Sequence, residues 1–236
     1  MCELEGRIRY SEVNSEGKLT ILSLMDYFQD CSVFQSASVG MDVEYLSKNN
    51  MAWMLVFWQI KIIKMPKLGD KIKVHTWAYD MKGFYGYRNF AMTTDEGEIL
   101  AKADSIWILV DTKTGRPKKI SKEISDFYEY KERMDMEEVP RKINLPEVYE
   151  DRQAVEVPAY FIDTNNHMNN TKYVMVALEY VPKEFEFDEV RVEYRKEAVL
   201  GDRIYPKVTQ MKDKIIVSLA KDSKTYYANV CFIKKG

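Results

Sequence analysis

The sequence predicts an α+β protein of two similar halves, each an antiparallel sheet wrapped around one helix. Three observations indicate this fold. A Leu-Gly-Asp turn occurs at Leu68 and again 132 positions later, at Leu200 (200 − 68). An apolar segment with helical period precedes each turn, and runs of alternating apolar and polar residues follow it. Two such copies can join edge to edge, which removes exposed sheet edges.

Upstream of each Leu-Gly-Asp turn, the sequence predicts a short strand, a polar loop and an apolar helix. In the first half these are expected at residues 7–11, 12–18 and 22–39, and in the second half at residues 154–162, 163–169 and 170–181. The first helix is predicted from its period, because Leu24, Phe28 and Cys31 fall on one line of a helix. Gly40 suits the position that ends this helix.

The strands are predicted from alternation and from the turn residues between them. One strand face is expected to carry Ile72, Val74, Thr76 and Ala78, and the other Lys71, Lys73, His75 and Trp77. An Asp-Glu-Gly sequence at residues 95–97 indicates a hairpin between strands at residues 86–93 and 99–111. Strands of the second half are expected at residues 190–197, 203–211, 215–220 and 225–233.

A charged segment separates the two halves. Residues 122–149 are dense in charge and contain Pro140 and Pro146, so we predict a linker there, with a partly exposed helix at residues 124–136. The predicted domains are therefore residues 1–121 and residues 150–236, joined by the linker at residues 122–149.

The composition argues against several classes of protein. Hydrophobic residues are 46% of the 236 positions, which is ample for a packed core. A net charge of −2 argues against nucleic acid held by bulk charge, and no window approaches the 18 apolar residues of a membrane span. With two histidines and no paired cysteines, a zinc site has no ligand set, and no cofactor is expected. Three widely spaced cysteines and a charged, leaderless N-terminus predict reduced thiols and a cytoplasmic protein.

The densest group of chemically active side chains lies at residues 163–170. Asp163, Asn165 and His167 are spaced by two, so an extended backbone would point all three to one face. A carboxylate to orient, an amide to donate and an imidazole to handle protons are what acyl transfer needs. The alternative is structural: Asn169 or Asn170 is the N-cap of the following helix, and the histidine lies beside that cap.

Glu197 is the second candidate, at the end of the strand predicted over residues 190–197. The repeat places Met65 at its position in the first half (197 − 132), and residues 12–16 opposite the polar loop. Neither of these carries an imidazole, so at the matching positions only the second half combines an acid with a histidine. The alternative is that Glu197 is a surface charge before a turn.

Four blocks of the sequence, taken together, point to one family. They are residues 163–173, residues 193–197, the strand pair around Trp53, Trp58, Pro66, Gly69 and Trp77, and residues 97–107. In this order, and over nearly the whole chain, they resemble the acyl-ACP thioesterases of plants and bacteria, which are double hotdog proteins. The first two blocks are the more specific. Plant members commonly have a cysteine after the glutamate, whereas this chain has Ala198, which excludes a cysteine nucleophile at that position.

The resemblance implies two tandem hotdog domains and a thioester hydrolase that releases fatty acid from acyl carrier protein (ACP). It implies a catalytic group of Asp163, Asn165, His167 and Glu197. Glu197 would activate water or attack directly, His167 would orient it and assist the leaving thiolate, Asn165 would hold the oxyanion, and Asp163 would fix the geometry.

Two further sets of residues follow from that expectation. An acyl pocket is expected in the first half, with candidates Met25, Phe28, Trp53, Met54 and Trp58, although ordinary core packing explains these residues equally. Because ACP is acidic, its docking patch should be basic, and the densest basic cluster consists of Lys113, Arg116, Lys118, Lys119 and Lys122. The alternative is a solvated loop.

Three rival functions stay open from the sequence. The same chemistry could act on acyl-CoA, a hotdog dehydratase or hydratase also uses one histidine with one acid, and a non-catalytic protein could bind acyl thioesters. A homodimer is also expected, because hotdog sheets often pair further.

Overall fold

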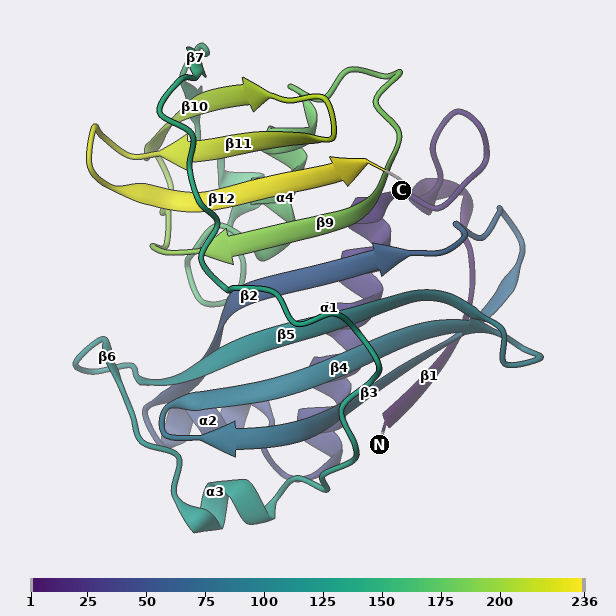
Figure 1. Cartoon of the computed structure of the whole chain (residues 1–236). Coiled ribbons are helices and arrows are strands. Elements are labelled where there is room, and N and C mark those ends of the chain that lie inside the picture. Colours follow the sequence, from purple (N-terminus) through teal and green to yellow (C-terminus); the bar gives the residue numbers. More distant parts are fainter. Residues whose placement is uncertain (1, 235–236) are drawn as a thin grey trace. The chain divides into compact units, whose positions relative to one another are not determined.

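The computed structural model describes residues 2–234 and divides the chain into two compact units. The first unit runs to Leu55 and continues at Ile60–Glu137; the second holds Val56–Gln59 and the described residues from Glu138 onward. Figure 1 shows each unit as an antiparallel sheet with a helix against one face. This confirms the predicted α+β class with an antiparallel sheet around a helix in each half.

The first unit is built on five long strands and one long helix. Its elements are β1 (Cys2–Arg7), the 3₁₀ helix η1 (Tyr10–Glu12), α1 (Ile21–Ser38), α2 (Val43–Lys48), β2 (Met51–Ile62), β3 (Lys71–Lys82), β4 (Tyr85–Thr94), β5 (Ile99–Asp111), β6 (Arg116–Pro117) and α3 (Lys122–Asp126). The strand order is β1-β3-β4-β5-β2, with β6 paired to β5, and α1 packs against β1 and β3 (Figure 1).

The amphipathic patterns of the first unit explain its core. Thr20 caps α1 by accepting a hydrogen bond from the Ser23 backbone at 3.1 Å. The predicted inward face of β3 is buried and its other face is not, as alternation requires. Phe28 of α1 meets Phe90 of β4 with ring centroids 5.3 Å apart. Full burial of each such ring stabilises the fold by roughly 1.5–3 kcal/mol.

The second unit repeats this plan with a shorter helix. Its elements are β7 (Glu150–Asp151), β8 (Val155–Glu156), the 3₁₀ helix η2 (Ala159–Phe161), α4 (Asn170–Leu178), β9 (Phe187–Tyr194), β10 (Arg203–Gln210), β11 (Lys214–Ala220) and β12 (Tyr226–Lys234). The strand order is β9-β12-β11-β10-β7, β8 also pairs with β10, and α4 packs against β11 and β12 (Figure 1).

The short strands predicted before each polar loop are misplaced. In the first unit the strand is Cys2–Arg7, so only Arg7 of the expected residues 7–11 is strand, and Tyr10 and Ser11 belong to η1. The Glu12 carboxylate closes this turn by accepting hydrogen bonds from the backbone and the side chain of Arg9, both at 2.7 Å. In the second unit only Val155–Glu156 is strand, and η2 occupies the end of the predicted range.

The helix predicted at residues 124–136 is also wrong. Only α3 forms, and the chain after it lies along the first sheet, where the sheet's side chains bind its backbone. The Trp77 indole N–H donates to the Glu132 carbonyl at 2.9 Å, and the Lys102 ammonium donates to the Asp135 carbonyl at 2.6 Å. Carbonyl groups bound in this way do not need the bonds of a helix, so tertiary contacts override local propensity.

The strand predicted over residues 190–197 ends early, at Tyr194. The backbone N–H groups of Arg195 and Lys196 both donate to the Tyr227 carbonyl, at 2.9 and 3.1 Å. Because two successive N–H groups share one carbonyl, the regular pairing and the alternation of the strand stop there. Glu197 therefore lies beyond the strand.

Candidate active site

The polar loop at residues 163–169 is closed on itself and is not extended. Asp163 Oδ1 accepts hydrogen bonds from the backbone N–H groups of Asn165 and His167, at 2.8 and 3.4 Å. The Asp163 N–H donates to the His167 carbonyl at 2.8 Å, and Asn166 adopts a left-handed φ of 61°. The expectation of an extended run with three side chains on one face is therefore wrong. The carboxylate of Asp163 folds the loop into an Asx turn instead.

The helix α4 begins directly after this loop. Asn169 is its N-cap, because its side-chain oxygen accepts from the Thr171 N–H at 3.0 Å and from the Thr171 hydroxyl at 2.9 Å. This decides between the two predicted caps and assigns Asn169 a structural role. Asn165 plays no part in the cap, and its side chain is exposed.

Two hydrogen bonds tie the loop and the helix α4 that follows it to the segment that carries Glu197. The Met168 N–H donates to the Ala198 carbonyl at 2.8 Å, and the Ala198 N–H donates to the Tyr173 hydroxyl at 2.9 Å. Burial, and then the nearby carboxylates of Glu197 and Asp163, raise the pKa of Tyr173 above its ordinary value, although the Ala198 N–H opposes the shift. All four predicted site residues therefore lie in one neighbourhood of the second unit.

The four predicted site residues differ in their exposure to solvent. Asn165 and Glu197 are exposed, while Asp163 and His167 are half-buried. Within residues 2–234, no hydrogen bond or ion pair engages the side chains of Asn165, His167 or Glu197. These side chains can therefore bind a substrate without breaking an internal contact.

The first unit contains a loop with the same backbone design. Asn14 Oδ1 accepts from the backbone N–H groups of Glu16 and Lys18, at 3.0 and 3.1 Å, and Gly17 has a φ of 72°. These match Asp163 and its partners at an offset of 149 positions (163 − 14). The Leu19 N–H donates to the Pro66 carbonyl at 2.9 Å, as the Met168 N–H does to Ala198.

This twin loop corrects the predicted internal alignment. The counterpart of residues 163–167 is residues 14–18 and not residues 12–16, because the offset is 149 before the helix and 132 at the Leu-Gly-Asp turn. The twin carries Glu16, Lys18 and Met65 where the second unit has Asn165, His167 and Glu197. The backbone arrangement thus forms without an imidazole or the second acid, so folding alone does not require them.

The predicted acyl-pocket residues lie largely in the core. Met25, Phe28 and Trp58 are no more than 1% exposed. Trp53 and Met54 are half-buried, and the Trp53 ring meets the Tyr128 ring edge-on at 6.5 Å. Such burial is what core packing requires, and the assignment to an acyl chain stays a prediction.

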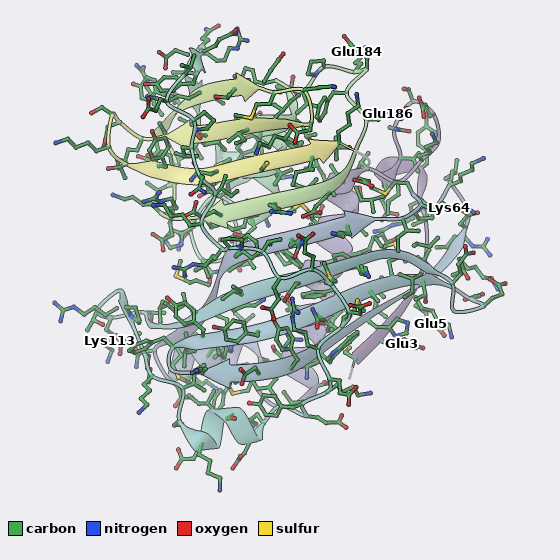
Figure 2. All side chains as sticks on the ribbon, viewed as in Figure 1. Glu3, Glu5, Lys64, Lys113, Glu184 and Glu186 are labelled. Atoms are coloured by element: carbon green, nitrogen blue, oxygen red, sulfur yellow. The ribbon has the colours of Figure 1, made fainter. Side chains whose placement is uncertain are left out.

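The predicted basic cluster lies on and after the turn between β5 and β6. Asp111 is used within this turn, since its Oδ1 accepts from the backbone N–H groups of Lys113 and Thr114 at 3.0 and 2.8 Å. Hydrogen bonds from Thr114 lower the pKa of Asp111. Figure 2 shows Lys113 projecting outward from this turn, and among the described residues no cation of the cluster forms an ion pair.

Within residues 2–234, no helix is long and apolar enough to cross a membrane. The same part of the chain contains no group of three or more histidine, cysteine, aspartate or glutamate side chains placed to hold a metal ion.

The family model for the acyl-ACP thioesterase N-terminal domain matches residues 4–128, and the model for the C-terminal domain of that family matches residues 147–229. The chain is 25% identical over 224 residues to a chloroplastic palmitoyl-acyl carrier protein thioesterase of Gossypium hirsutum, covering 87% of this chain and 54% of that protein. It is 25% identical over 224 residues to the chloroplastic oleoyl-acyl carrier protein thioesterase 1 of Arabidopsis thaliana, covering 83% and 60%. The chain thus spans little more than half the length of these curated relatives.

Solved structures share the fold over nearly the full length. An acyl-ACP thioesterase from Bacteroides thetaiotaomicron superposes with a TM-score of 0.89 and 21% identity, covering 99% of this chain and 97% of that one. The 12:0-ACP thioesterase from Umbellularia californica gives a TM-score of 0.85 and 21% identity, covering 99% and 96%. These similarities show the predicted tandem fold.

Proposed function

We propose that this chain, which belongs to the acyl-ACP thioesterase family, hydrolyses the thioester of acyl-ACP and releases the free fatty acid. The observation that carries the proposal is the pair of hydrogen bonds that join the loop of Asp163, Asn165 and His167, and the helix α4 behind it, to the segment of Glu197. The first unit keeps this backbone arrangement but has Met65 in place of Glu197 and Lys18 in place of His167. The names of the relatives support the substrate class.

In this proposal water adds to the thioester carbonyl, the C–S bond breaks, and the products are a fatty acid and the thiol of the carrier. Glu197 takes the proton of the attacking water, or attacks first to form a mixed anhydride that water then opens. His167 orients this carboxylate and assists proton transfer to the leaving thiolate. Asn165, with a backbone N–H at the start of α4, holds the developing oxyanion. Met25, Phe28, Trp53, Met54 and Trp58 are the proposed wall of the acyl site.

The test of this function is thiol release from a panel of acyl-ACP thioesters of different chain length, beside the matching acyl-CoA thioesters. Rapid release from one range of acyl-ACP chains is expected. Faster turnover of acyl-CoA would favour the rival hydrolase. A change in enoyl absorbance without thiol release would indicate a dehydratase or hydratase. No reaction with any thioester would favour the third rival, a non-catalytic protein that binds acyl thioesters. A homodimer and a cytoplasmic location are further predictions, which this assay does not address.

Replacing Asp163 by asparagine should separate the folding role of this residue from its charge. Asn14 closes the twin loop with a neutral amide, so Asp163→Asn is expected to keep the loop and to change the free energy of unfolding by no more than about 0.5 kcal/mol. Thiol release should fall by about 10-fold or more, because residues that orient a catalytic group typically contribute about 10–100-fold. Thermal unfolding and kcat/KM on acyl-ACP measure the two effects.

The matched control is Asn14→Asp, which makes the reverse change in the first unit and should leave kcat/KM unchanged. Wild-type activity in Asp163→Asn would show that the carboxylate serves only to close the loop. A large loss of stability would show that the two loops are not equivalent.

Docking of the acidic carrier to the basic cluster predicts a specific dependence on salt. Rising ionic strength should slow hydrolysis of acyl-ACP, while hydrolysis of a small acyl-pantetheine thioester should respond little. Lys113→Glu with Arg116→Glu should raise KM for acyl-ACP by about 10-fold or more, since like charges at an interface cost several kcal/mol. Lys64→Glu is the control, because Lys64 lies at the other end of the first unit in Figure 2. Equal salt dependence of both substrates would contradict docking at this cluster.

A further inference from the structure

Comparison of the two loops singles out Tyr173, a residue that the spacing of the sequence did not identify. Its counterpart in the first unit is Leu24 (173 − 149), and the counterpart of Ala198 is Pro66 (198 − 132). Leucine has no hydroxyl, and proline has no backbone N–H. Both partners of the 2.9 Å hydrogen bond from Ala198 to Tyr173 are therefore missing in the first unit, and they are missing together.

The other contact of this segment is kept in both units. The Leu19 N–H reaches the Pro66 carbonyl at 2.9 Å, and the Met168 N–H reaches the Ala198 carbonyl at 2.8 Å. The loop can therefore hold its neighbouring segment without a hydroxyl. The unit that carries Glu197 has the extra bond, and the unit with Met65 does not.

The side chain of Tyr173 is buried beside the segment that carries Glu197. The residue is 3% exposed, and its ring meets that of Tyr194 edge-on at 5.7 Å. Packing alone does not call for the hydroxyl, because leucine holds the matching position of the first unit. The hydroxyl oxygen of Tyr173 accepts from the Ala198 N–H, so the hydroxyl proton points away from that N–H. The carboxylates of Glu197 and Asp163 act on Tyr173 electrostatically.

We propose that Tyr173 is a positioning residue, which anchors the backbone beside Glu197 and so fixes the direction of that carboxylate in the site. The backbone of Ala198 is held at its carbonyl by Met168 and at its N–H by Tyr173, and this N–H belongs to the peptide bond between Glu197 and Ala198. The inference rests on the proposed function, because it assigns Tyr173 to the same reaction.

The variant Tyr173→Phe removes the hydroxyl and keeps the ring. We expect kcat on acyl-ACP to fall by about 10–100-fold with little change in KM, since a small misplacement of a reacting group costs up to about 100-fold. Tyr194→Phe is the matched control. It removes another hydrogen-bonded tyrosine hydroxyl of the second unit, which donates to the Asn170 carbonyl at 3.0 Å. The control should lose similar stability and keep its kcat.

A second variant separates positioning from stability. In Tyr173→Phe the Ala198 N–H is buried without a partner, whereas Tyr173→Phe with Ala198→Pro removes that N–H, as in the first unit. The melting temperature of this double variant should return toward the wild-type value while kcat stays low. Recovery of both quantities would overturn the inference, and so would a kcat for Tyr173→Phe within twofold of wild type. Wild-type protein that releases no thiol from any acyl-ACP would instead overturn the proposed function, and this inference with it.

Discussion

Glu197→Gln is expected to lower kcat/KM for acyl-ACP by about 10²–10⁴-fold, the usual contribution of a general base. Glutamine keeps the length and shape of the side chain but can neither accept a proton from water nor attack a carbonyl. Glu197 is exposed, and no hydrogen bond or ion pair within residues 2–234 uses its carboxylate. The free energy of unfolding should therefore stay within about 0.5 kcal/mol of wild type. Thiol release and thermal unfolding of the same preparation measure both.

The first unit supplies the control for this substitution. Met65 holds the position of Glu197 in the repeat, so Met65→Gln places the same amide beside the twin loop and should leave kcat/KM unchanged. Near-wild-type turnover by Glu197→Gln would rule out both roles proposed for Glu197, as base and as nucleophile. Hydrolysis would then depend on a water molecule activated by another group of the loop.

The fold was predictable where the signal is local. The two faces of β3 follow from the alternation of apolar and polar residues, and the hairpin between β4 and β5 follows from its Asp-Glu-Gly turn. The helix expected at residues 22–39 forms as Ile21–Ser38 for the same reason, since its apolar period must meet a sheet. Alternation, turn residues and helical period depend on residues that are close in the sequence, so they can be recognised from the sequence alone.

The sequence was insufficient where distant partners decide the conformation. Nothing near residues 124–136 shows that Trp77 and Lys102 bind the carbonyl groups of Glu132 and Asp135. The early end of β9 depends on the carbonyl of Tyr227, more than thirty residues away. In both cases local propensity favoured regular structure, and a hydrogen bond from elsewhere in the sheet opposed it.

The candidate site shows the same division. Residue type, spacing and family resemblance singled out Asp163, Asn165, His167 and Glu197 as candidates, and the structure brings their segments together. The spacing argument itself failed, because the Asp163 carboxylate binds the loop backbone and abolishes the extended conformation. Tyr173 was missed because its partner, Ala198, is 25 positions away. The signal that could have found it is the joint change of Leu24 and Pro66 to Tyr173 and Ala198 between the two halves.

His167→Ala is expected to lower kcat/KM for acyl-ACP by about 10²–10⁴-fold, because it removes the group that assists proton transfer to the leaving thiolate. The loop should survive, since its hydrogen bonds use only the backbone of His167. The loss should shrink on an aryl thioester, whose thiolate leaves without a proton, so the ratio of the two losses measures this role.

The control for His167 is Lys18→Ala, the same change at the matching position of the twin loop, and both substrates should be turned over at the wild-type rate. An equal loss on alkyl and aryl thioesters would assign His167 to orienting Glu197 or the attacking water. No loss on either substrate would favour the structural alternative, in which His167 only lies beside the cap made by Asn169. Because the twin loop folds with lysine at this position, a loss of activity in His167→Ala with unchanged stability can be attributed to chemistry and not to folding.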